Sequence, residues 1–441
     1  MIQRRLLLFV LLFTTILINI TLLNAQSDED EVEIIEVEQG FGAEKGFWQV
    51  FFTAPTGSRD SADYVGGIDL QLIADIENAR GTLDIAAFEW KNPLITQAVV
   101  DAHERGVAVR MVVDDEHVLE EYEDAELFGE ESPFADIVDA DIPFVDDDRG
   151  ALMHNKFMII DGSVVWMGSM NYTINGTYRN NNNMLSIRSR RVAEAYQVEF
   201  DEMFGDGEEG EFGPTSPEND TNAFNVDGTS VQVFFASEND VITPLIETLL
   251  TAEESIHFMT FSFTRDDIGV ALIDRAYSGV EVQGIFETRG SQTAFSEMPR
   301  GYCAGLDYRQ DGNPFTLHHK VFIIDETTVI TGSFNFSDNA TESNDENMVI
   351  IEDADLAAQF MAEFERVWEA GEYPEGDDVV CENARPNTSP WDGRASNFTC
   401  PDTSATCGDL TCAQAFACLR EGNTRLDGDG DGVPCASVCG F

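Results

Sequence analysis

The sequence predicts an α/β protein in which two similar α/β halves follow one another and a small cysteine-rich domain closes the chain. Short apolar runs alternate with segments of helical periodicity, which is typical of α/β folds. The same order of segments occurs twice, beginning at residues 49–52 and again at 232–235, both Gln-Val-Phe-Phe. Seven of the eight cysteines lie after residue 380, which sets the tail apart from both halves.

The composition limits what the protein can be. The 441 residues include 82 Asp and Glu but only 25 Lys and Arg, for a net charge of −57. A chain of this length is expected to form several domains. With 43% hydrophobic and 10% aromatic residues, most of it should fold rather than stay disordered. The acidity argues against a broad nucleic-acid-binding surface, because the overall field repels phosphate backbones.

The first 25 residues have the features of a secretory signal peptide. Arg4 and Arg5 precede the apolar run 6–23, and the small residue Ala25 follows it. An uncleaved membrane anchor is the alternative, although polar residues such as Asn19 weaken the run as a membrane span. We expect export, with the mature protein secreted or held at the cell surface. An acidic segment, 26–45, leads into the first half.

The first half is expected over residues 46–204. Its pattern predicts a helix at 68–79, a strand at 82–88, a helix at 98–105 and a strand at 107–113. We interpret the acidic stretch 116–148 as a solvated loop with a short helix. Residues 205–230 lack apolar periodicity and are predicted to be a linker.

The second half, 231–371, repeats this order. A helix is predicted at 242–253, a strand at 255–263, a helix at 268–277 and a strand at 280–286. Each half therefore has the order strand–helix–strand–helix–strand, which implies a largely parallel or mixed sheet.

Each half contains the same polar constellation at the same spacing. The chain has only six histidines and four lysines, so about 0.05 His-x-Lys triplets are expected by chance, and two occur. A Ser, an Asn and a second Asn follow each His at 15, 17 and 29 residues. The first set is His154, Lys156, Asp161, Ser169, Asn171 and Asn183, and the second is His318, Lys320, Asp325, Ser333, Asn335 and Asn347.

These residues can form a phosphate-binding site. A His and a Lys two apart on a strand share one face, as do the Ser and Asn that end the next strand. An imidazole, an ammonium, a hydroxyl and a carboxamide from each half would hold phosphate oxygens by hydrogen bonds and point charges. We interpret Asp161 and Asp325 as anchors of the turn between the two strands rather than as proton carriers.

The doubled pattern His-x-Lys-x4-Asp, followed by Gly-Ser-x-Asn, resembles the signature of the phospholipase D superfamily over about residues 46–371. The resemblance implies a pseudo-dimer with one active site between the halves. It also implies two-step phosphodiester cleavage without a metal or other cofactor. In that scheme His154 is the nucleophile, His318 is the general acid and base, and Lys156 and Lys320 stabilise charge on the phosphate. Asp161 and Asp325 complete the two motifs.

The two motifs differ at one position. Family members often carry a carboxylate near the end of the motif that orients the His of the same half. Glu346 occupies that position in the second half, whereas Asn182 occupies it in the first. A carboxylate partner makes an imidazole more basic, which leaves open the alternative that His318 attacks. We interpret His319 as a filler residue on the opposite strand face. Residues 88–90 and 261–263 could border the pocket by their position, but we favour aromatic core packing for them.

The tail follows a second linker, 372–406, and spans 407–441. Asp427, Asp429 and Asp431 followed by Gly432 match the front half of an EF-hand calcium loop. The segment resembles the small extracellular calcium-binding domain called excalibur, which implies a weak calcium site. The alternatives are an acidic turn attached to Cys435 and a zinc site. In an exported chain the cysteines read as a disulfide framework, and eight can pair fully if Cys303 reaches a tail cysteine.

The function predicted from these observations is a secreted phosphodiesterase that removes phospholipid headgroups, converting lipids such as phosphatidylcholine to phosphatidic acid. Contact with a membrane surface would be peripheral, and a zwitterionic lipid suits the acidic chain better than a strongly anionic bilayer. A metal-independent endonuclease of the same superfamily is the nearest alternative, disfavoured by the missing basic surface. A non-catalytic, calcium-dependent cell-surface module is an alternative of another class. We expect a monomer with an internal pseudo-dimer.

Overall fold

The computed structural model describes residues 31–207, 210–215 and 222–374, together with residues 379, 404, 406–409, 418, 423–426 and 435 of the tail. The predicted signal peptide and the predicted calcium ligands Asp427, Asp429 and Asp431 lie outside the described residues.

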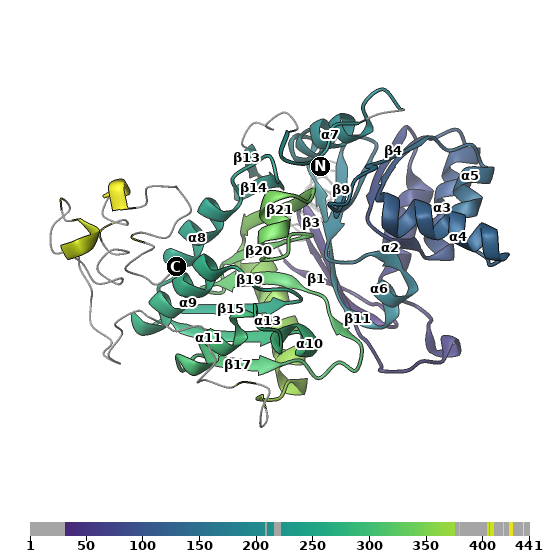
Figure 1. The fold of residues 1–441 in the computed structure, drawn as a ribbon. Coiled ribbons are helices and arrows are strands. Elements are labelled where there is room, and N and C mark those ends of the chain that lie inside the picture. Colours follow the sequence, from purple (N-terminus) through teal and green to yellow (C-terminus); the bar gives the residue numbers. More distant parts are fainter. Residues whose placement is uncertain are drawn as a thin grey trace, which may run out of the picture.

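Each half is built on one mixed β-sheet (Figure 1). The first sheet has nine strands in the order β1-β2-β3-β12-β9-β8-β4-β6-β7. Strands β4, β6 and β7 run parallel to one another, and the other neighbours are antiparallel. The strands are β1 (Glu33–Ile35), β2 (Gly40–Lys45), β3 (Trp48–Thr53), β4 (Thr82–Ala87), β6 (Ala108–Val113), β7 (Phe144–Asp146), β8 (Lys156–Ile160), β9 (Val164–Gly168) and β12 (Asn183–Arg188).

The second sheet has eight strands in the order β13-β14-β21-β20-β19-β15-β16-β17. From β14 to β17 this order reproduces that of β3 to β7 in the first sheet, including the parallel trio at the end. The strands are β13 (Asn222–Val226), β14 (Thr229–Ala236), β15 (Ser255–Thr260), β16 (Glu281–Phe286), β17 (Asp307–Gln310), β19 (Lys320–Ile324), β20 (Thr328–Gly332) and β21 (Glu346–Glu352).

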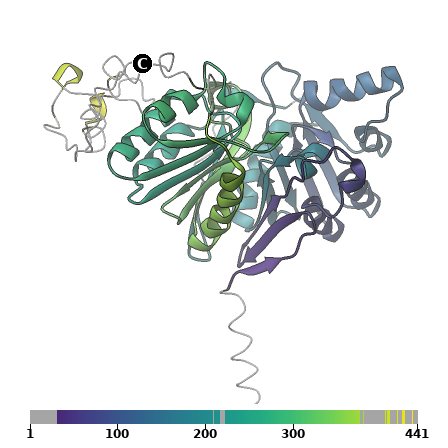
Figure 2. The same ribbon diagram turned by 90° about the horizontal axis from the view of Figure 1, so that it is seen from below.

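Helices cover both faces of each sheet. Figure 2 shows the two halves side by side, with α13 near their boundary. Helices α7 and α13 pack between the sheets, and most of the others cover the outer faces. The first half has α2 (Asp69–Asn78), α3 (Pro93–Glu104), α4 (Glu121–Phe128), α5 (Phe134–Asp139), α6 (Ile174–Tyr178) and α7 (Arg190–Phe204); the second has α8 (Ile242–Leu250), α9 (Asp266–Tyr277), α10 (Thr288–Ser291), α11 (Glu297–Cys303), α12 (Asp338–Glu342) and α13 (Ala354–Ala370).

The largest apolar core belongs to both halves. It joins Phe52 and Phe157 of the first half to Phe235 and Phe360 of the second, all fully buried or nearly so. Each half also has a core of its own, which lies between its sheet and its outer helices. Because burial of apolar surface drives folding, this shared core fixes the position of one half against the other.

The structure confirms the predicted fold class of two tandem α/β halves with mixed sheets. The predicted helices at 68–79 and 242–253 correspond to α2 and α8, and the strand predicted at 107–113 corresponds to β6. Three stretches are more regular than expected. The acidic insert contains α4, α5 and β7, the predicted linker contains β13, and the acidic leading segment contains β1 and β2. Strand pairing at the sheet edge gave order to residues whose polar composition suggested loops.

Two further findings concern the cysteines and the hydropathy of the helices. Cys407 and Cys435 form a disulfide within the tail, and Cys303 of the second half is also disulfide-bonded. Among the described residues, no helix is both long enough and apolar enough to cross a membrane.

Candidate active site

The two His-x-Lys motifs occupy equivalent places in the two sheets. Strands β8 and β19 begin at Lys156 and Lys320, so each histidine lies just before its strand rather than within it. Each ammonium Nζ donates a hydrogen bond to the carbonyl of its own histidine, at 2.7 Å for Lys156 and 2.9 Å for Lys320. All four side chains are buried, which removes them from bulk water and strengthens electrostatic effects between them.

The backbone at each histidine is held by the other half. The His154 amide donates to the Asp345 carbonyl, and the His318 amide donates to the Asn181 carbonyl, both at 2.9 Å. In the second case a short parallel ladder surrounds the contact, formed by β11 (Asn180–Asn181) and β18 (Thr316–Leu317). The two halves therefore exchange backbone segments next to the histidines.

The histidine side chains follow the same exchange, and this corrects one expectation. His154 Nδ1 lies 2.6 Å from Glu346 Oε2, and His318 Nδ1 lies 2.9 Å from Asn182 Oδ1. The prediction that Glu346 would orient the histidine of its own half is wrong, because the parallel bridge between Met153 and Asp345 carries Glu346 to His154. His154 is thus the histidine with a carboxylate partner.

The partners define which ring nitrogen is free. His318 Nδ1 faces two oxygen acceptors, Asn182 Oδ1 and the Ser169 carbonyl at 3.0 Å, so this nitrogen must carry a hydrogen. A carboxylate beside His154 Nδ1 favours a hydrogen there as well. In both rings Nε2 is then left for chemistry.

The two serines hold the partner side chains rather than standing free for a substrate. Ser169 Oγ lies 2.9 Å from Asn182 Oδ1, and Ser333 Oγ donates to Glu346 Oε2 at 2.8 Å. Both hydroxyls also accept a backbone amide hydrogen, from Asn183 and Asn347 respectively. The serines were expected to bind phosphate. Instead, Ser169 and Ser333 hold Asn182 and Glu346, the two side chains that contact the histidines.

The second asparagines link the halves. Asn183 Nδ2 donates to Thr331 Oγ1 at 3.0 Å, and Asn347 Nδ2 donates to Asn155 Oδ1 at 2.8 Å. Both asparagines are fully buried. Their amides are therefore engaged at the interface rather than directed to a substrate.

Of the remaining asparagines, Asn171 donates a short hydrogen bond to the Glu89 carboxylate. Asn335 Oδ1 is buried and has no hydrogen-bond partner among the described residues. Sequence reasoning gave Glu89 no role of its own, because it favoured aromatic packing for residues 88–90. Its position between two aromatic residues at the end of β4 was the available signal.

The aromatic residues at 88–90 and 261–263 divide between the two interpretations. Trp90 and Phe263 pack in the cores as favoured, whereas Phe88 and Phe261 border the site. The Phe88 ring lies 4.6 Å from the His154 ring and 4.6 Å from Lys156 Nζ. The Phe261 ring lies 4.9 Å from the His318 ring and 4.9 Å from Lys320 Nζ. Each ring excludes water and offers a cation–π face to its lysine.

Asp161 and Asp325 lie away from the histidines, in turns. The Asp161 carboxylate accepts hydrogen bonds from the backbone amides of residues 80–82, and that of Asp325 accepts from residues 253–255. Both residues have positive φ, 51° and 49°. Burial raises the pKa of both carboxyls, but the backbone amides outweigh it and lower the pKa overall.

The site concentrates ionisable groups in a desolvated space. Burial lowers the pKa of His154 and of His318 well below the ordinary range, and the two nearby lysines lower it further. Burial also lowers the pKa of Lys156 to about 7 and raises the pKa of Glu346 to about 8. Four groups that can be cationic lie in this space, with Glu346, Glu89 and Asp114 as the nearby carboxylates. A bound phosphodiester anion would favour the protonated forms of the four groups.

His319 immediately precedes β19, and its side chain contacts Asn183 and α13 rather than the other two histidines, as expected for a residue on the opposite face. It is fully buried, with Nδ1 3.2 Å from Asn183 Oδ1 and Nε2 3.1 Å from Glu363 Oε1. The equivalent residue of the first half is Asn155. His319 therefore joins β19 to α13 and is more than a filler.

Comparison with known proteins identifies related chains. The family described as "Cardiolipin synthase, PLD-like domain" matches residues 72–204 and 245–368, one stretch in each half. Human mitochondrial cardiolipin hydrolase is 33% identical over 128 residues, which is 29% of this chain and 51% of that protein.

A second curated relative is a phospholipase D from Rickettsia bellii, 38% identical over 111 residues, or 25% of this chain and 55% of that one. The chain spans about half the length of the curated relatives it matches. The crystal structure of phosphatidylserine synthase from Haemophilus influenzae has a TM-score of 0.51 at 15% identity. It covers 73% of this chain and 90% of that one, which supports the fold of both halves together.

Proposed function

Since the chain belongs to the family of PLD-like phosphodiesterases, we propose that it hydrolyses the headgroup phosphodiester of phospholipids and releases phosphatidic acid. One observation carries the proposal. The structure brings His154, paired with Glu346, and His318, paired with Asn182, into one buried site with Lys156 and Lys320. The tandem halves supply both histidines from a single chain.

In the first step His154 Nε2 attacks phosphorus. A P–N bond forms and the bond from phosphorus to the headgroup oxygen breaks, while His318 Nε2 gives its proton to the departing alkoxide. A headgroup alkoxide is a poor leaving group, so general acid catalysis and a covalent intermediate both lower the barrier.

In the second step His318, now neutral, takes a proton from water. The water oxygen attacks phosphorus, the P–N bond breaks, and His154 returns to its starting form, with the hydrogen on its Nδ1 still donated to the Glu346 carboxylate. Lys156 and Lys320 stabilise negative charge on the non-bridging oxygens through both steps. Members of this superfamily typically act without a metal.

The partner of each histidine supports this division of roles. Positive charge develops on the imidazole that bonds to phosphorus, and the Glu346 carboxylate stabilises it. The neutral carboxamide of Asn182 leaves His318 less basic and therefore a better proton donor. The alternative in which His318 is the nucleophile assumed that Glu346 contacts His318. Glu346 contacts His154 instead, so this argument for the alternative is lost.

The choice of lipid over nucleic acid draws on two observations. Two curated relatives are named for lipid substrates, as cardiolipin hydrolase and phospholipase D. The net charge of −57 opposes binding of a polyanionic strand. On overall charge alone, a zwitterionic lipid such as phosphatidylcholine is an accessible substrate.

The test is to incubate the purified protein with phosphatidylcholine, single-stranded DNA and RNA, with and without EDTA. A His154→Ala variant is the comparison, and His103→Ala on α3 is the matched control. We expect choline release that survives EDTA, persists in the control and disappears in the His154 variant. Cleavage of DNA or RNA without lipid hydrolysis would instead favour the endonuclease.

Export and calcium binding stay proposals of their own. We propose that residues 1–25 direct secretion and that Asp427, Asp429 and Asp431 bind calcium in an excalibur-like tail, all outside the described residues. Calcium at millimolar concentration should raise the melting temperature of the oxidised full-length protein. An Asp429→Asn variant should lose the shift, and its absence in the unaltered protein would contradict the calcium site.

A further inference from the structure

The residue between the histidine and the lysine differs between the two motifs, being His319 in the second and Asn155 in the first. Each contacts the second asparagine of the opposite half. His319 Nδ1 lies 3.2 Å from Asn183 Oδ1, and Asn347 Nδ2 donates to Asn155 Oδ1 at 2.8 Å. All four side chains are fully buried. The middle position of each motif therefore takes part in the exchange between the halves.

His319 donates hydrogen bonds from both ring nitrogens. Its Nδ1 faces Asn183 Oδ1, while the Asn183 amide nitrogen donates to Thr331 Oγ1 at 3.0 Å. Its Nε2 faces Glu363 Oε1 at 3.1 Å, and the other oxygen of that carboxylate accepts two hydrogen bonds from Arg366, at 2.8 and 3.0 Å. A carboxylate bound in this way is ionised. Because both ring nitrogens face oxygens that carry no hydrogen, the ring holds a hydrogen on each and is an imidazolium.

His319 determines how the carboxamide of Asn183 is turned. A ring that only donates requires the carboxamide oxygen, and this oxygen then also faces Ser169 Oγ, at 3.0 Å. In the other half the equivalent carboxamide is turned the opposite way. Asn347 directs its nitrogen toward Ser333 Oγ, at 3.4 Å, because the asparagine of the first motif offers it an oxygen. The two serines therefore differ in what faces them.

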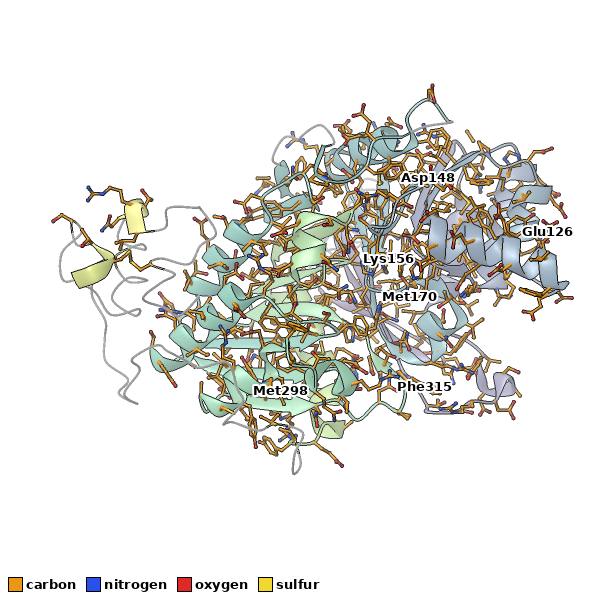
Figure 3. All side chains as sticks on the ribbon, in the orientation of Figure 1. Glu126, Asp148, Lys156, Met170, Met298 and Phe315 are labelled. Atoms are coloured by element: carbon orange, nitrogen blue, oxygen red, sulfur yellow. A yellow bond between two sulfur atoms is a disulfide. The ribbon has the colours of Figure 1, made fainter. Side chains whose placement is uncertain are left out.

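Ser169 connects this carboxamide to the proton donor of the proposed reaction. Its Oγ lies 2.9 Å from Asn182 Oδ1, which lies 2.9 Å from His318 Nδ1. A hydroxyl has one hydrogen to donate, and the oxygens of Asn182 and Asn183 compete for that of Ser169. The more of it Asn183 takes, the more fully Asn182 can accept from His318. Figure 3 labels Met170, which follows Ser169 in the chain, where the two halves meet.

These contacts bear on catalysis if the proposed function holds, and the following inference rests on it. His318 must keep the hydrogen on Nδ1 so that Nε2 can give its proton to the leaving alkoxide. We propose that His319 is a positioning residue for His318 and acts through the carboxamide of Asn183. By holding the carboxamide oxygen toward Ser169, it weakens the competition of the serine for Asn182. The Asn182 oxygen then stays bonded to the proton donor.

The first half has no need of this arrangement. His154 is held by the Glu346 carboxylate, which is a stronger acceptor than a carboxamide. Ser333 gives its hydrogen to the same carboxylate, at 2.8 Å, and a charged group with two oxygens accepts several hydrogen bonds at once. Asn182 is neutral and has one oxygen for two donors, so a further group that relieves this oxygen has more effect there.

The experiment exchanges the middle residue of the second motif for that of the first. In His319→Asn the new oxygen would accept from Asn183, as Asn155 accepts in the first motif, so the Asn183 carboxamide would turn over. The matched control is His257→Asn on β15. His257 is also a buried histidine that packs on α13, with its ring 4.8 Å from that of Phe364. Each protein is assayed on phosphatidylcholine and on a p-nitrophenyl phosphodiester, whose leaving group departs with little protonation.

We expect kcat for phosphatidylcholine to fall about tenfold in His319→Asn, the effect of one impaired hydrogen bond, with KM changed by less than about twofold. The burst of p-nitrophenol should keep its rate within about twofold, since that step needs little help from His318. His257→Asn should leave both reactions unchanged at temperatures where it is folded. A misplaced proton donor would cause a loss confined to the substrate with the poor leaving group, whereas a general loss of packing would not.

A double variant tests the route from His319 to His318. If His319 acts through Ser169, then Ser169→Ala combined with His319→Asn should lose no more activity than the larger of the two single variants. Additive losses, an unchanged kcat in His319→Asn, or an equal fall on both substrates overturns the His319 proposal and leaves lipid hydrolysis intact. A fall in His257→Asn as large as that in His319→Asn does the same. If the unaltered protein hydrolyses no phosphatidylcholine, the proposed function is wrong, and the inference falls with it.

Discussion

His154 of the first half receives a carboxylate from Glu346, whereas His318 of the second half receives the carboxamide of Asn182. Several features around the two histidines are repeated: the lysine, the serine, the bordering phenylalanine and the strands that carry them. The comparison shows how a pseudo-symmetric scaffold can separate a nucleophile from a proton donor. One side-chain difference, delivered across the interface, gives one imidazole a carboxylate partner and the other a carboxamide partner.

Removing each histidine tests the separation most strongly. We expect His154→Ala and His318→Ala to lower lipid turnover by at least about 10³-fold, the scale of lost nucleophilic or general acid catalysis. A p-nitrophenyl phosphodiester needs little protonation of its leaving group. With it, His318→Ala should still give a burst of p-nitrophenol and a trapped phosphoenzyme, and His154→Ala should give neither. A burst in His154→Ala alone would reverse the two roles.

Changing Glu346 to Gln should have the next largest effect. With its carboxylate gone, His154 becomes a weaker nucleophile, and we expect kcat to fall by roughly 10²-fold while micelle binding is unchanged. Glu346→Asp should recover part of the loss. An effect confined to KM, or a change in unfolding temperature as large as that of a core mutation, would indicate a structural role instead.

Changing Asn182 to Asp makes the two halves alike, and its effect is expected in the pH profile. Burial lowers the pKa of His318, so at neutral pH little of it is protonated before substrate binds. A carboxylate at position 182 would raise that pKa. The alkaline limb of kcat/KM should therefore move upward by about one pH unit. Movement of the acidic limb alone would show that Asn182 does not act on the proton donor.

The smallest effects are expected in the turns, where the halves do not differ. Asp161→Ala and Asp325→Ala should each lower the free energy of unfolding by about 1–2 kcal/mol, because three backbone amides lose a charged acceptor. Both carboxyls have a lowered pKa when folded. Their contribution is therefore complete above about pH 4 and is lost as the pH falls through the lowered value. Denaturant unfolding at pH 7 and pH 3 would measure this, and a loss of turnover without a loss of stability would contradict it.

Much of this site could be predicted because the chain repeats itself. Identical spacing in the two copies identified His154, Lys156 and their equivalents, and apolar periodicity located strands such as β6 and helices such as α2. Spacing within one half, however, contains no information about which half a segment contacts. The exchange that brings Glu346 to His154 depends on bridges between the sheets, so it required the structure.

The exchange of segments between the halves also bears on how such a chain can change over evolutionary time. A first half paired with a copy of itself would hold both histidines with carboxamides, and a second half paired with a copy of itself would hold both with carboxylates. Only the unlike pair supplies one of each. Divergence at positions 182 and 346 therefore makes the duplication irreversible. If one half were deleted, or replaced by a copy of the other, the two histidines of the site would have identical partners.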